Sequence, residues 1–313
     1  LSNGTVRSLY RQSPDSIWIG TDGGGINLFS PHTEKFTHYS STWGDKVAFI
    51  SGFTPGKLLI SLFSKGVFVF NPATGEQPFT IIDKETTTRL CNRGKSVNLY
   101  QNTPNIVLFL GDHIYQYHLK EKKFSTITEE EGKDIVGTLV PFDHQENLTY
   151  INDIKHIYEL DDQTSRLKTV FECYTDTVIS SVSHDEQGHF WIGSNFGLIH
   201  YDPVLKSRTL VPTNLFTEIN MVLCDQKGKV WIGVDNMLFA YFIKEQKFVL
   251  FGESNGAIQN EYLPNARLVN EQGDAYIGGV KGMLRIDGQL LLNTSEMPEL
   301  QLLDITINGE SAN

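Results

Sequence analysis

The sequence repeats a short pattern of a tryptophan, an isoleucine and a glycine. The pattern occurs at residues 17–21, 190–194 and 230–234, which read IWIGT, FWIGS and VWIGV. Each copy is followed by a loop containing Gly, Asn or Asp and then by a second apolar stretch, and weaker copies lie between them. Such a repeat restricts the chain to architectures in which similar units pack side by side.

The repeat defines seven units. Their first apolar residues after the loop are 41, 47, 43, 41, 40 and 45 residues apart; these are Ile26, Val67, Ile114, Ile157, Leu198, Leu238 and Met283. A period of about 40 to 50 residues built from short strands is typical of a propeller blade. Helical repeats are disfavoured because the units alternate apolar and polar residues and are interrupted by Gly, Asn, Asp and Pro. The sequence therefore predicts an all-β protein, a seven-bladed β-propeller of four-stranded antiparallel blades.

Four strands are expected within each unit. In the fifth unit they cover residues 178–184, 189–194, 197–202 and 207–211. The tryptophan of the second strand is predicted to fill the space between adjacent blades, and the glycine two residues later to allow close backbone approach. Segments 185–188, 225–228 and 270–273 lie just before the Trp or Tyr strand, where a hairpin needs a turn with positive φ, so they are predicted to be hairpin turns. They are not predicted to be calcium loops, because they lack the further oxygen ligands and the terminal Glu. The seventh unit has no convincing fourth strand: it could be closed by residues upstream of Leu1 or by residues 289–293, or be left open.

Composition limits the function. The 313 residues carry 26 Lys and Arg against 37 Asp and Glu, a formal charge of -11, and such a field repels phosphate backbones, so we expect no nucleic acid partner. The longest apolar run, residues 237–243, is much shorter than the ~18 residues of a membrane-spanning helix. Cys91, Cys173 and Cys224 are far apart, and the nine histidines show no HExxH or HxH pattern. We therefore predict no metal site, no cofactor and no catalytic residue.

The repeat resembles the two-component regulator propeller repeat. The resemblance rests on the Trp-Ile-Gly-Thr string at residues 18–21, the apolar strand after it, and the Ser-Pro and Asp-Pro pairs at 30–31 and 202–203, whereas units three and four match poorly. Residues 255–262 (NGAIQNEY) with 276–282 (YIGGVKG) are similar to the last blade of that family. Residues 298–309 are similar to the opening strand of the triple-tyrosine, immunoglobulin-like domain that follows it. We therefore expect a propeller at residues 1–295 and the truncated start of that domain at 296–313.

The resemblance also implies a function. In that family, such propellers lie outside the cytoplasm in hybrid two-component systems of gut Bacteroidetes, ahead of one membrane helix and a histidine kinase. By that pattern this chain is a C-terminal propeller fragment of a periplasmic sensor region, which forms a homodimer in the full-length protein and meets the membrane only through downstream segments.

The expected ligand is an oligosaccharide, and the expected output is the regulation of carbohydrate-utilisation genes through a kinase absent from the fragment. One alternative is a structural or protein-binding propeller with the ligand site elsewhere. Another is a polysaccharide-active enzyme, for which two convergent carboxylates in the central opening would be required.

Candidate ligand-binding residues come from the loops. In a propeller, the loops between second and third strands and those joining blades gather on one face around the central channel. Aromatic rings suit the CH faces of sugars, while amides and charged groups suit their hydroxyls. The candidates are Trp43, Arg89, Arg93, Lys95, Asn195, Asn236, Asn260, Glu261, Tyr262 and Lys281. Arg89, Arg93 and Lys95 would contact carboxylate or sulfate groups if the ligand were anionic.

Overall fold

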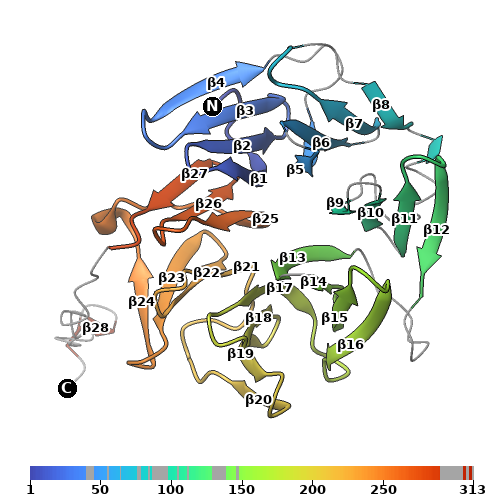
Figure 1. Ribbon diagram of the computed structural model, residues 1–313. Coiled ribbons are helices and arrows are strands. Elements are labelled where there is room, and N and C mark those ends of the chain that lie inside the picture. Colours follow the sequence, from blue (N-terminus) through green and yellow to red (C-terminus); the bar gives the residue numbers. More distant parts are fainter. Residues whose placement is uncertain are drawn as a thin grey trace.

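The chain folds as a ring of seven antiparallel β-sheets, each forming one blade (Figure 1). The computed structural model describes residues 1–39, 46–54, 56–63, 65–75, 79–83, 85–86, 98–103, 106–110, 113–128, 139–145, 148–289, 306–307 and 310–311. Six blades have four strands, and the seventh has three within these residues. The predicted seven-bladed all-β propeller is confirmed.

Within each blade the strands follow chain order from the centre of the ring outward (Figure 1). The first two blades are β1 (Val6–Ser13), β2 (Ser16–Thr21), β3 (Ile26–Ser30) and β4 (Lys35–Tyr39), then β5 (Val47–Phe53), β6 (Lys57–Leu62), β7 (Gly66–Phe70) and β8 (Phe79–Ile82). The next two are β9 (Asn98–Thr103), β10 (Ile106–Leu110), β11 (Ile114–His118) and β12 (Lys123–Ile127), then β13 (Val140–Gln145), β14 (Leu148–Asn152), β15 (His156–Asp161) and β16 (Arg166–Glu172). The fifth and sixth are β17 (Ile179–His184), β18 (Phe190–Ser194), β19 (Gly197–Asp202) and β20 (Ser207–Leu210), then β21 (Met221–Cys224), β22 (Lys229–Val234), β23 (Met237–Phe242) and β24 (Lys247–Phe251). The seventh is β25 (Tyr262–Val269), β26 (Ala275–Gly279) and β27 (Gly282–Ile286), and a 3₁₀ turn, η1 (Glu253–Asn255), precedes it.

The local sequence signals correspond to the observed elements. The four strands of blade 5 lie within one residue of their predicted bounds. The predicted turns are present as well: Gly188, Gly228 and Gly273 have φ angles of 86°, 85° and 87°, a region that glycine enters without steric cost. In the first of these turns, Asp185 Oδ1 accepts the backbone N–H groups of Gln187 and His189 at 3.0 and 2.9 Å.

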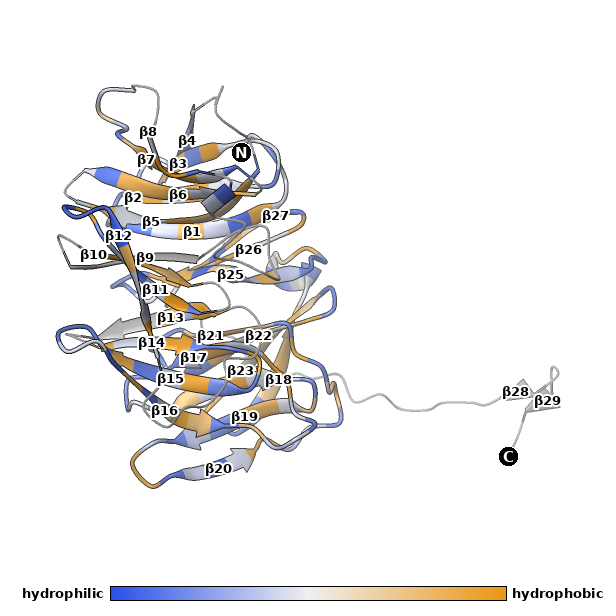
Figure 2. Ribbon diagram, turned by 90° about the vertical axis from the view of Figure 1, so that its right-hand side faces the viewer, coloured by the Kyte–Doolittle hydropathy of each residue, from blue (hydrophilic) through white to orange (hydrophobic). Residues whose placement is uncertain are grey.

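The repeated tryptophan and glycine hold adjacent blades together. Trp18, Trp191 and Trp231 are 1%, 3% and 1% exposed, and each packs into an apolar cluster that includes residues of the next blade. A Cβ on Gly193 would lie 2.8 Å from Val222 Cγ2 of blade 6, closer than real Cβ atoms approach, so glycine suits this position. Figure 2 shows hydrophobic residues along the strands and hydrophilic ones at many of the turns. Both residues of the repeat are therefore scaffold, as predicted.

Serine side chains link the innermost strands of neighbouring blades. In three places a buried serine Oγ accepts a backbone N–H from the next blade: Ser8 from Ile50 at 3.0 Å, Ser181 from Val222 at 3.0 Å and Ser183 from Cys224 at 2.9 Å. Innermost strands of different blades share no ladder, so these bonds satisfy backbone groups that the sheets leave open.

The ring closes by packing blade 7 against blade 1. Strand β1 belongs to blade 1 and packs against β25 and β26. Thr5 Oγ1 donates a hydrogen bond to Val280 O at 3.3 Å, and Arg11 pairs with Glu271 at 3.3 Å. Residues 289–293 are one candidate for a fourth strand of blade 7. Gln289 lies in a turn, and residues 290–293 are outside the described part of the chain.

The expected second domain at residues 296–313 falls almost entirely outside the described residues. Within it the structure defines only a short pair of strands, β28 (Thr306–Ile307) and β29 (Glu310–Ser311). The boundary at residue 295 therefore stays a prediction. In the described part of the chain, no helix has the length and apolar character needed to cross a membrane.

Candidate functional site

Four of the predicted ligand-binding residues cannot be placed. Trp43, Arg89, Arg93 and Lys95 all lie outside the residues that the structure describes. Their roles, including the suggested contacts to an anionic ligand, stay predictions. The other six lie on loops between strands, or at the beginning of β25.

Four of these six residues come together where the loops of blades 6 and 7 meet. Asn260 donates its backbone N–H to Asn236 O at 3.0 Å, and Asn260 Oδ1 accepts the backbone N–H of Lys281 at 2.9 Å. The carbonyl of Glu261 accepts the N–H of Val280 at 3.1 Å. The loop joining two blades therefore gathers with the loops between second and third strands, as the propeller pattern predicts.

Two of the predicted residues, Asn260 and Tyr262, are buried and hold these loops in place. Asn260 and Tyr262 are each 1% exposed. Tyr262 Oη donates a hydrogen bond to Ile258 O at 3.1 Å, and its Cβ packs over Gly233, where an added Cβ would lie 3.1 Å away. Asn236, Glu261 and Lys281 by contrast are exposed. A ligand can reach these three side chains from solvent.

Asn195 lies on a different part of the loop face. Its Oδ1 accepts the backbone N–H of Val178 at 2.7 Å, and its Nδ2 donates to Asp176 O at 3.1 Å, so its amide joins the loops of blades 4 and 5. The adjacent Phe196 is 52% exposed, and Tyr174 is 67% exposed with the Arg208 guanidinium 3.9 Å from its ring centroid. Both rings are therefore accessible from solvent.

A hollow of about 310 Å³ opens beside Asn236. It lies between the start of β23, the end of β24 and the loop that leads to blade 7. Its lining combines polar and apolar groups: Asn236, Met237, Leu238, Leu250, Phe251, Gly252, Glu253, Ala257, Ile258 and Gln259. Asn236, Glu253 and Gln259 are exposed and supply hydrogen-bonding groups, while Met237, Leu250 and Ile258 are 39%, 47% and 55% exposed. Exposed apolar side chains within reach of amides are the composition expected of a binding site.

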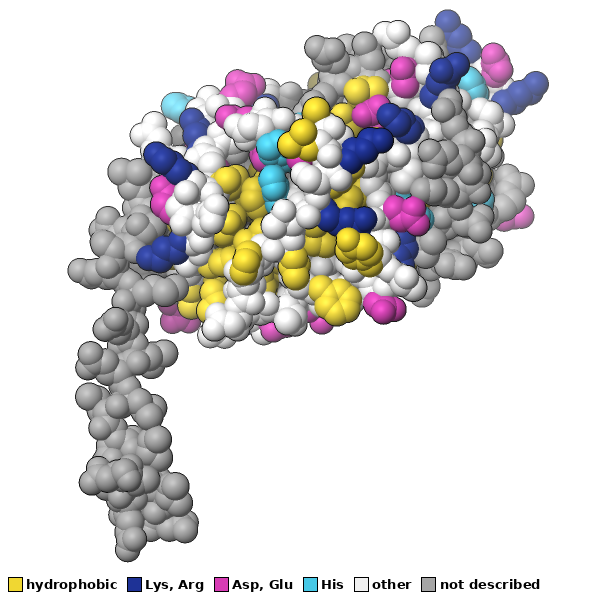
Figure 3. Space-filling model, turned by 90° about the horizontal axis from the view of Figure 1, so that it is seen from below, with side chains coloured by type: hydrophobic (Ala, Val, Ile, Leu, Met, Phe, Trp, Pro, Cys, Tyr) yellow, Lys and Arg dark blue, Asp and Glu magenta, His cyan; other side chains and the backbone are white. Residues whose placement is uncertain are grey.

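A second hollow, of about 510 Å³, lies between blades 5 and 6 and contains a cluster that the sequence analysis missed. Asp185, His189 and His200 line it together with Trp191 and Tyr241. Figure 3, which views the ring from below, shows histidine side chains beside a band of hydrophobic ones. The spacing of the histidines along the sequence did not indicate that these two lie in one hollow.

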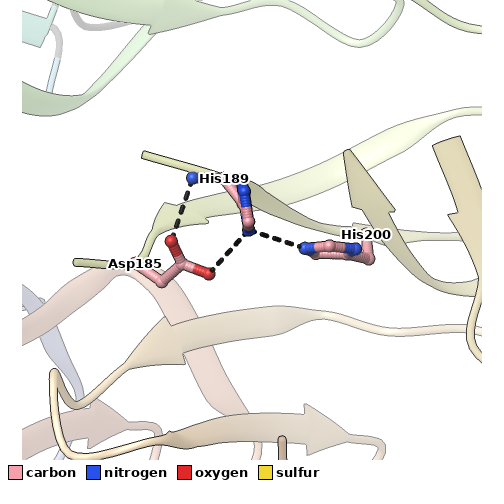
Figure 4. Close-up of side chains that lie close together, drawn as sticks. All are labelled: Asp185, His189 and His200. Atoms are coloured by element: carbon pink, nitrogen blue, oxygen red, sulfur yellow. Dashed lines mark hydrogen bonds and ion pairs between the residues drawn. The ribbon is translucent and has the colours of Figure 1, made fainter. Parts of the chain in front are cut away.

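The three side chains approach one another closely (Figure 4). His200 Nε2 lies 3.1 Å from His189 Nδ1, and His189 Nδ1 lies 3.7 Å from Asp185 Oδ2. Burial and the neighbouring His189 lower the pKa of His200, so its imidazole is neutral at neutral pH. The proximity of His189 and His200 follows from the register of the β18–β19 hairpin. That register pairs Trp191 with His200 and so brings the start of β18 near the end of β19.

A polysaccharide-active enzyme would need two convergent carboxylates in the central opening of the ring. The innermost strands β1, β5, β9, β13, β17, β21 and β25 contain one acidic residue in their sequences, Asp143 in β13. These strands do not supply the two convergent carboxylates that a glycosidase uses. The enzymatic alternative would therefore depend on loop residues.

Comparisons with known proteins identify the fold. No family model matches this chain, and no curated protein does either. Among solved structures, the chain is similar to the extracellular domain of the hybrid two component system BT3049 from B. thetaiotaomicron, with 17% identity and a TM-score of 0.71 over all of this chain and 44% of that one. The extracellular domain of the hybrid two component system BT4673 from the same organism has 15% identity and a TM-score of 0.68, over 90% of this chain and 38% of that one.

An enzyme shares the same architecture. Streptogramin B lyase matches with 8% identity and a TM-score of 0.66, over 90% of this chain and 93% of the lyase. At such identities the likeness shows the propeller fold alone. The chain spans less than half the length of the two extracellular domains, so its function has to be argued from its own surface.

Proposed function

We propose that this chain is an extracytoplasmic, ligand-sensing propeller of a two-component signalling protein, and that it detects an oligosaccharide in the hollow beside Asn236. Two observations support the proposal. The fold matches two extracellular domains of two-component systems, one of them along the whole chain. The hollow also contains Asn236, a residue that the sequence pattern alone selects as a ligand contact.

The observation that carries the proposal is the mixture of groups around Asn236. Its exposed amide lies with Gln259 and Glu253 on the same hollow, which provides donors and acceptors for sugar hydroxyls. Met237, Leu250 and Ile258 supply exposed apolar surface for the CH faces of a sugar ring. The carboxylate of Glu253 on the hollow favours a neutral oligosaccharide over a uronic acid or sulfated one, because like charges repel.

Signalling requires that the ligand favour one arrangement of the full-length protein. The proposed receptor is a periplasmic homodimer whose kinase lies beyond this chain and regulates carbohydrate-utilisation genes. An oligosaccharide that binds one dimer arrangement more tightly than another shifts the population by that difference in binding free energy. The position of the hollow on the loops joining blade 6 to blade 7, near the C-terminal end of the propeller, suits a ligand that reports to following segments.

Calorimetric titration of the chain with a panel of neutral and acidic oligosaccharides tests the proposal. We expect a neutral member to bind, and Asn236→Ala to weaken its binding about tenfold, which corresponds to about 1.4 kcal/mol. Lys168→Ala, an exposed residue on the outer strand β16, is the control and should bind as the wild type does. The absence of binding to every member of the panel, or equal binding by the Asn236→Ala variant, would overturn the assignment and favour a structural or protein-binding propeller.

A further inference from the structure

The cluster of Asp185, His189 and His200 has the spacing of a metal centre. One carboxylate oxygen and two imidazole nitrogens lie within 4.8 Å of one another. Ligands that bind one tetrahedral zinc ion at 2.0–2.1 Å are separated by about 3.3 Å. The separations of 3.1 Å between the two histidines and 3.7 Å between His189 and Asp185 lie on either side of that value. Since Asp185 and His200 also lie within 4.8 Å of each other, side-chain rotation can bring all three atoms onto one ion.

The turn before β18 fixes the carboxylate. Asp185 is 6% exposed, and its Oδ1 accepts the N–H groups of Gln187 and His189. Its Oδ2 accepts the indole N–H of Trp191 at 2.8 Å and still has a lone pair for a second interaction. The carboxylate is therefore oriented before any ion arrives, which lowers the entropic cost of binding one.

A second carboxylate orients His189 from the other side. Asp202 Oδ2 lies 3.6 Å from His189 Nε2, and Asp202 Oδ1 is itself held by the backbone N–H groups of Val204 and Leu205. A metal-bound histidine commonly directs its other ring N–H toward a carboxylate, which fixes the tautomer. This arrangement leaves the lone pair of Nδ1 facing His200 and Asp185.

The third ligand, His200, is positioned by packing. Its ring centroid lies 4.5 Å from that of Trp191, with an angle of 38° between the rings. Its Nε2 therefore faces Nδ1 of His189 across the hairpin. A proton shared between the two rings explains their separation without an ion, and it is the alternative that an experiment has to exclude.

We propose that Asp185, His189 and His200 bind a divalent transition-metal ion such as zinc, with Asp202 as the residue that positions His189. Two imidazoles with one carboxylate suit zinc, nickel or copper, whereas calcium and magnesium prefer oxygen ligands alone. All three side chains line the 510 Å³ hollow between blades 5 and 6, so the remaining coordination position is open to water or to a ligand group there. This site is separate from the hollow beside Asn236.

Titration of chelator-stripped protein with zinc alone tests this proposal. We expect one zinc per chain by calorimetry and by elemental analysis after dialysis, and little binding of calcium or magnesium. His200→Gln and His189→Gln should each weaken zinc binding by more than tenfold. Asp202→Asn leaves the three ligands in place and should weaken it by about tenfold, as positioning residues do.

His38→Gln is the matched control. His38 is an exposed histidine on β4, in blade 1, and its loss should leave zinc affinity unchanged. Circular dichroism and thermal unfolding of the metal-free variants establish that they are folded. Failure of the folded wild-type chain to bind zinc stoichiometrically would overturn the proposal, and so would an affinity that His200→Gln and His38→Gln change equally. Either result would assign the histidine contact to a shared proton.

Discussion

Val6 of the first blade occupies the space that a side chain at Gly278 of the last blade would need. A Cβ on Gly278 would lie 2.5 Å from Val6 Cγ1, and Val6 is fully buried. This contact closes the ring between strands that are separated by nearly the entire chain. Closure therefore depends on close packing of blade 7 on blade 1, together with the contacts of Thr5 and Arg11.

Gly278→Ala should destabilise the propeller by about 1–3 kcal/mol, because the added methyl group overpacks a filled interface. Gly252→Ala is the matched control, since Gly252 has a φ of -118° and, among the residues that the structure describes, no atom lies within 4 Å of an added Cβ. Urea unfolding monitored by tryptophan fluorescence measures both changes. A Gly278→Ala variant as stable as Gly252→Ala would show that the two blades do not pack as described.

The serines of the innermost strands allow a second comparison. Ser183→Ala removes the acceptor of the buried Cys224 N–H and should cost about 1–3 kcal/mol. Ser51 Oγ is also buried but has no hydrogen-bond partner among the residues that the structure describes. Ser51→Ala should therefore be neutral or slightly stabilising. The urea midpoint of Ser183→Ala should therefore be lower than that of Ser51→Ala. A lower midpoint for Ser51→Ala would contradict this role of the inter-blade hydrogen bonds.

The fold could be predicted from the sequence because the blades repeat the same pattern of alternating strands, turns and inter-blade residues. Trp191 and Gly193 could be assigned to the interface between blades from their positions in the repeat, and both lie there. The strand bounds of blade 5 followed from the alternation and from the turn ending at Gly188. These features are local, so one sequence suffices to read them.

The site could be predicted only in part, because residues in loops do not alternate between buried and exposed positions as residues in strands do. Asn236 and Asn260 were selected by the same reasoning, yet Asn236 is exposed on a hollow and Asn260 is buried under its neighbours. Which side of a loop faces inward depends on packing between blades. The meeting of His189 and His200 required the hairpin register and side-chain directions, which histidine spacing along the sequence does not reveal.

Asp274 should make the stability of blade 7 depend on pH. Burial alone would raise the pKa of Asp274, but hydrogen bonds from the Gly288 N–H and from Arg285 outweigh it and hold the pKa below its usual range. A lowered pKa contributes stability that is present above the unfolded-state value of about 4 and is lost as the pH falls through the folded-state value.

The urea midpoint of the wild type should therefore decrease as the pH falls below about 4, and Asp274→Asn should be less stable at neutral pH and show a weaker acid dependence. The exposed Glu121→Gln, in an outer turn of blade 3, serves as the control and should behave as the wild type does. Identical pH profiles for Asp274→Asn and the wild type would contradict the assigned role of Asp274.

The two described cysteines should be poorly reactive. Cys173 and Cys224 are free thiols, and burial raises the pKa of both, that of Cys173 to about 11. At pH 8 this leaves about a hundredfold less thiolate on Cys173 than on an ordinary cysteine. Alkylation by iodoacetamide, located by mass spectrometry, should be slow at both sites in the native protein and fast in urea. Rapid labelling of native Cys173 would be inconsistent with its surroundings in this structure.

The central claim is that this propeller binds an oligosaccharide in the hollow beside Asn236, and hydrogen–deuterium exchange with and without the oligosaccharide that binds most tightly tests it most directly. The predicted result is slower exchange in segments 236–238 and 250–259, which contain the residues that line the hollow, with no change in the outer strand β16. A saturating oligosaccharide that leaves these loops unprotected, or that protects another part of the ring instead, would contradict the claim.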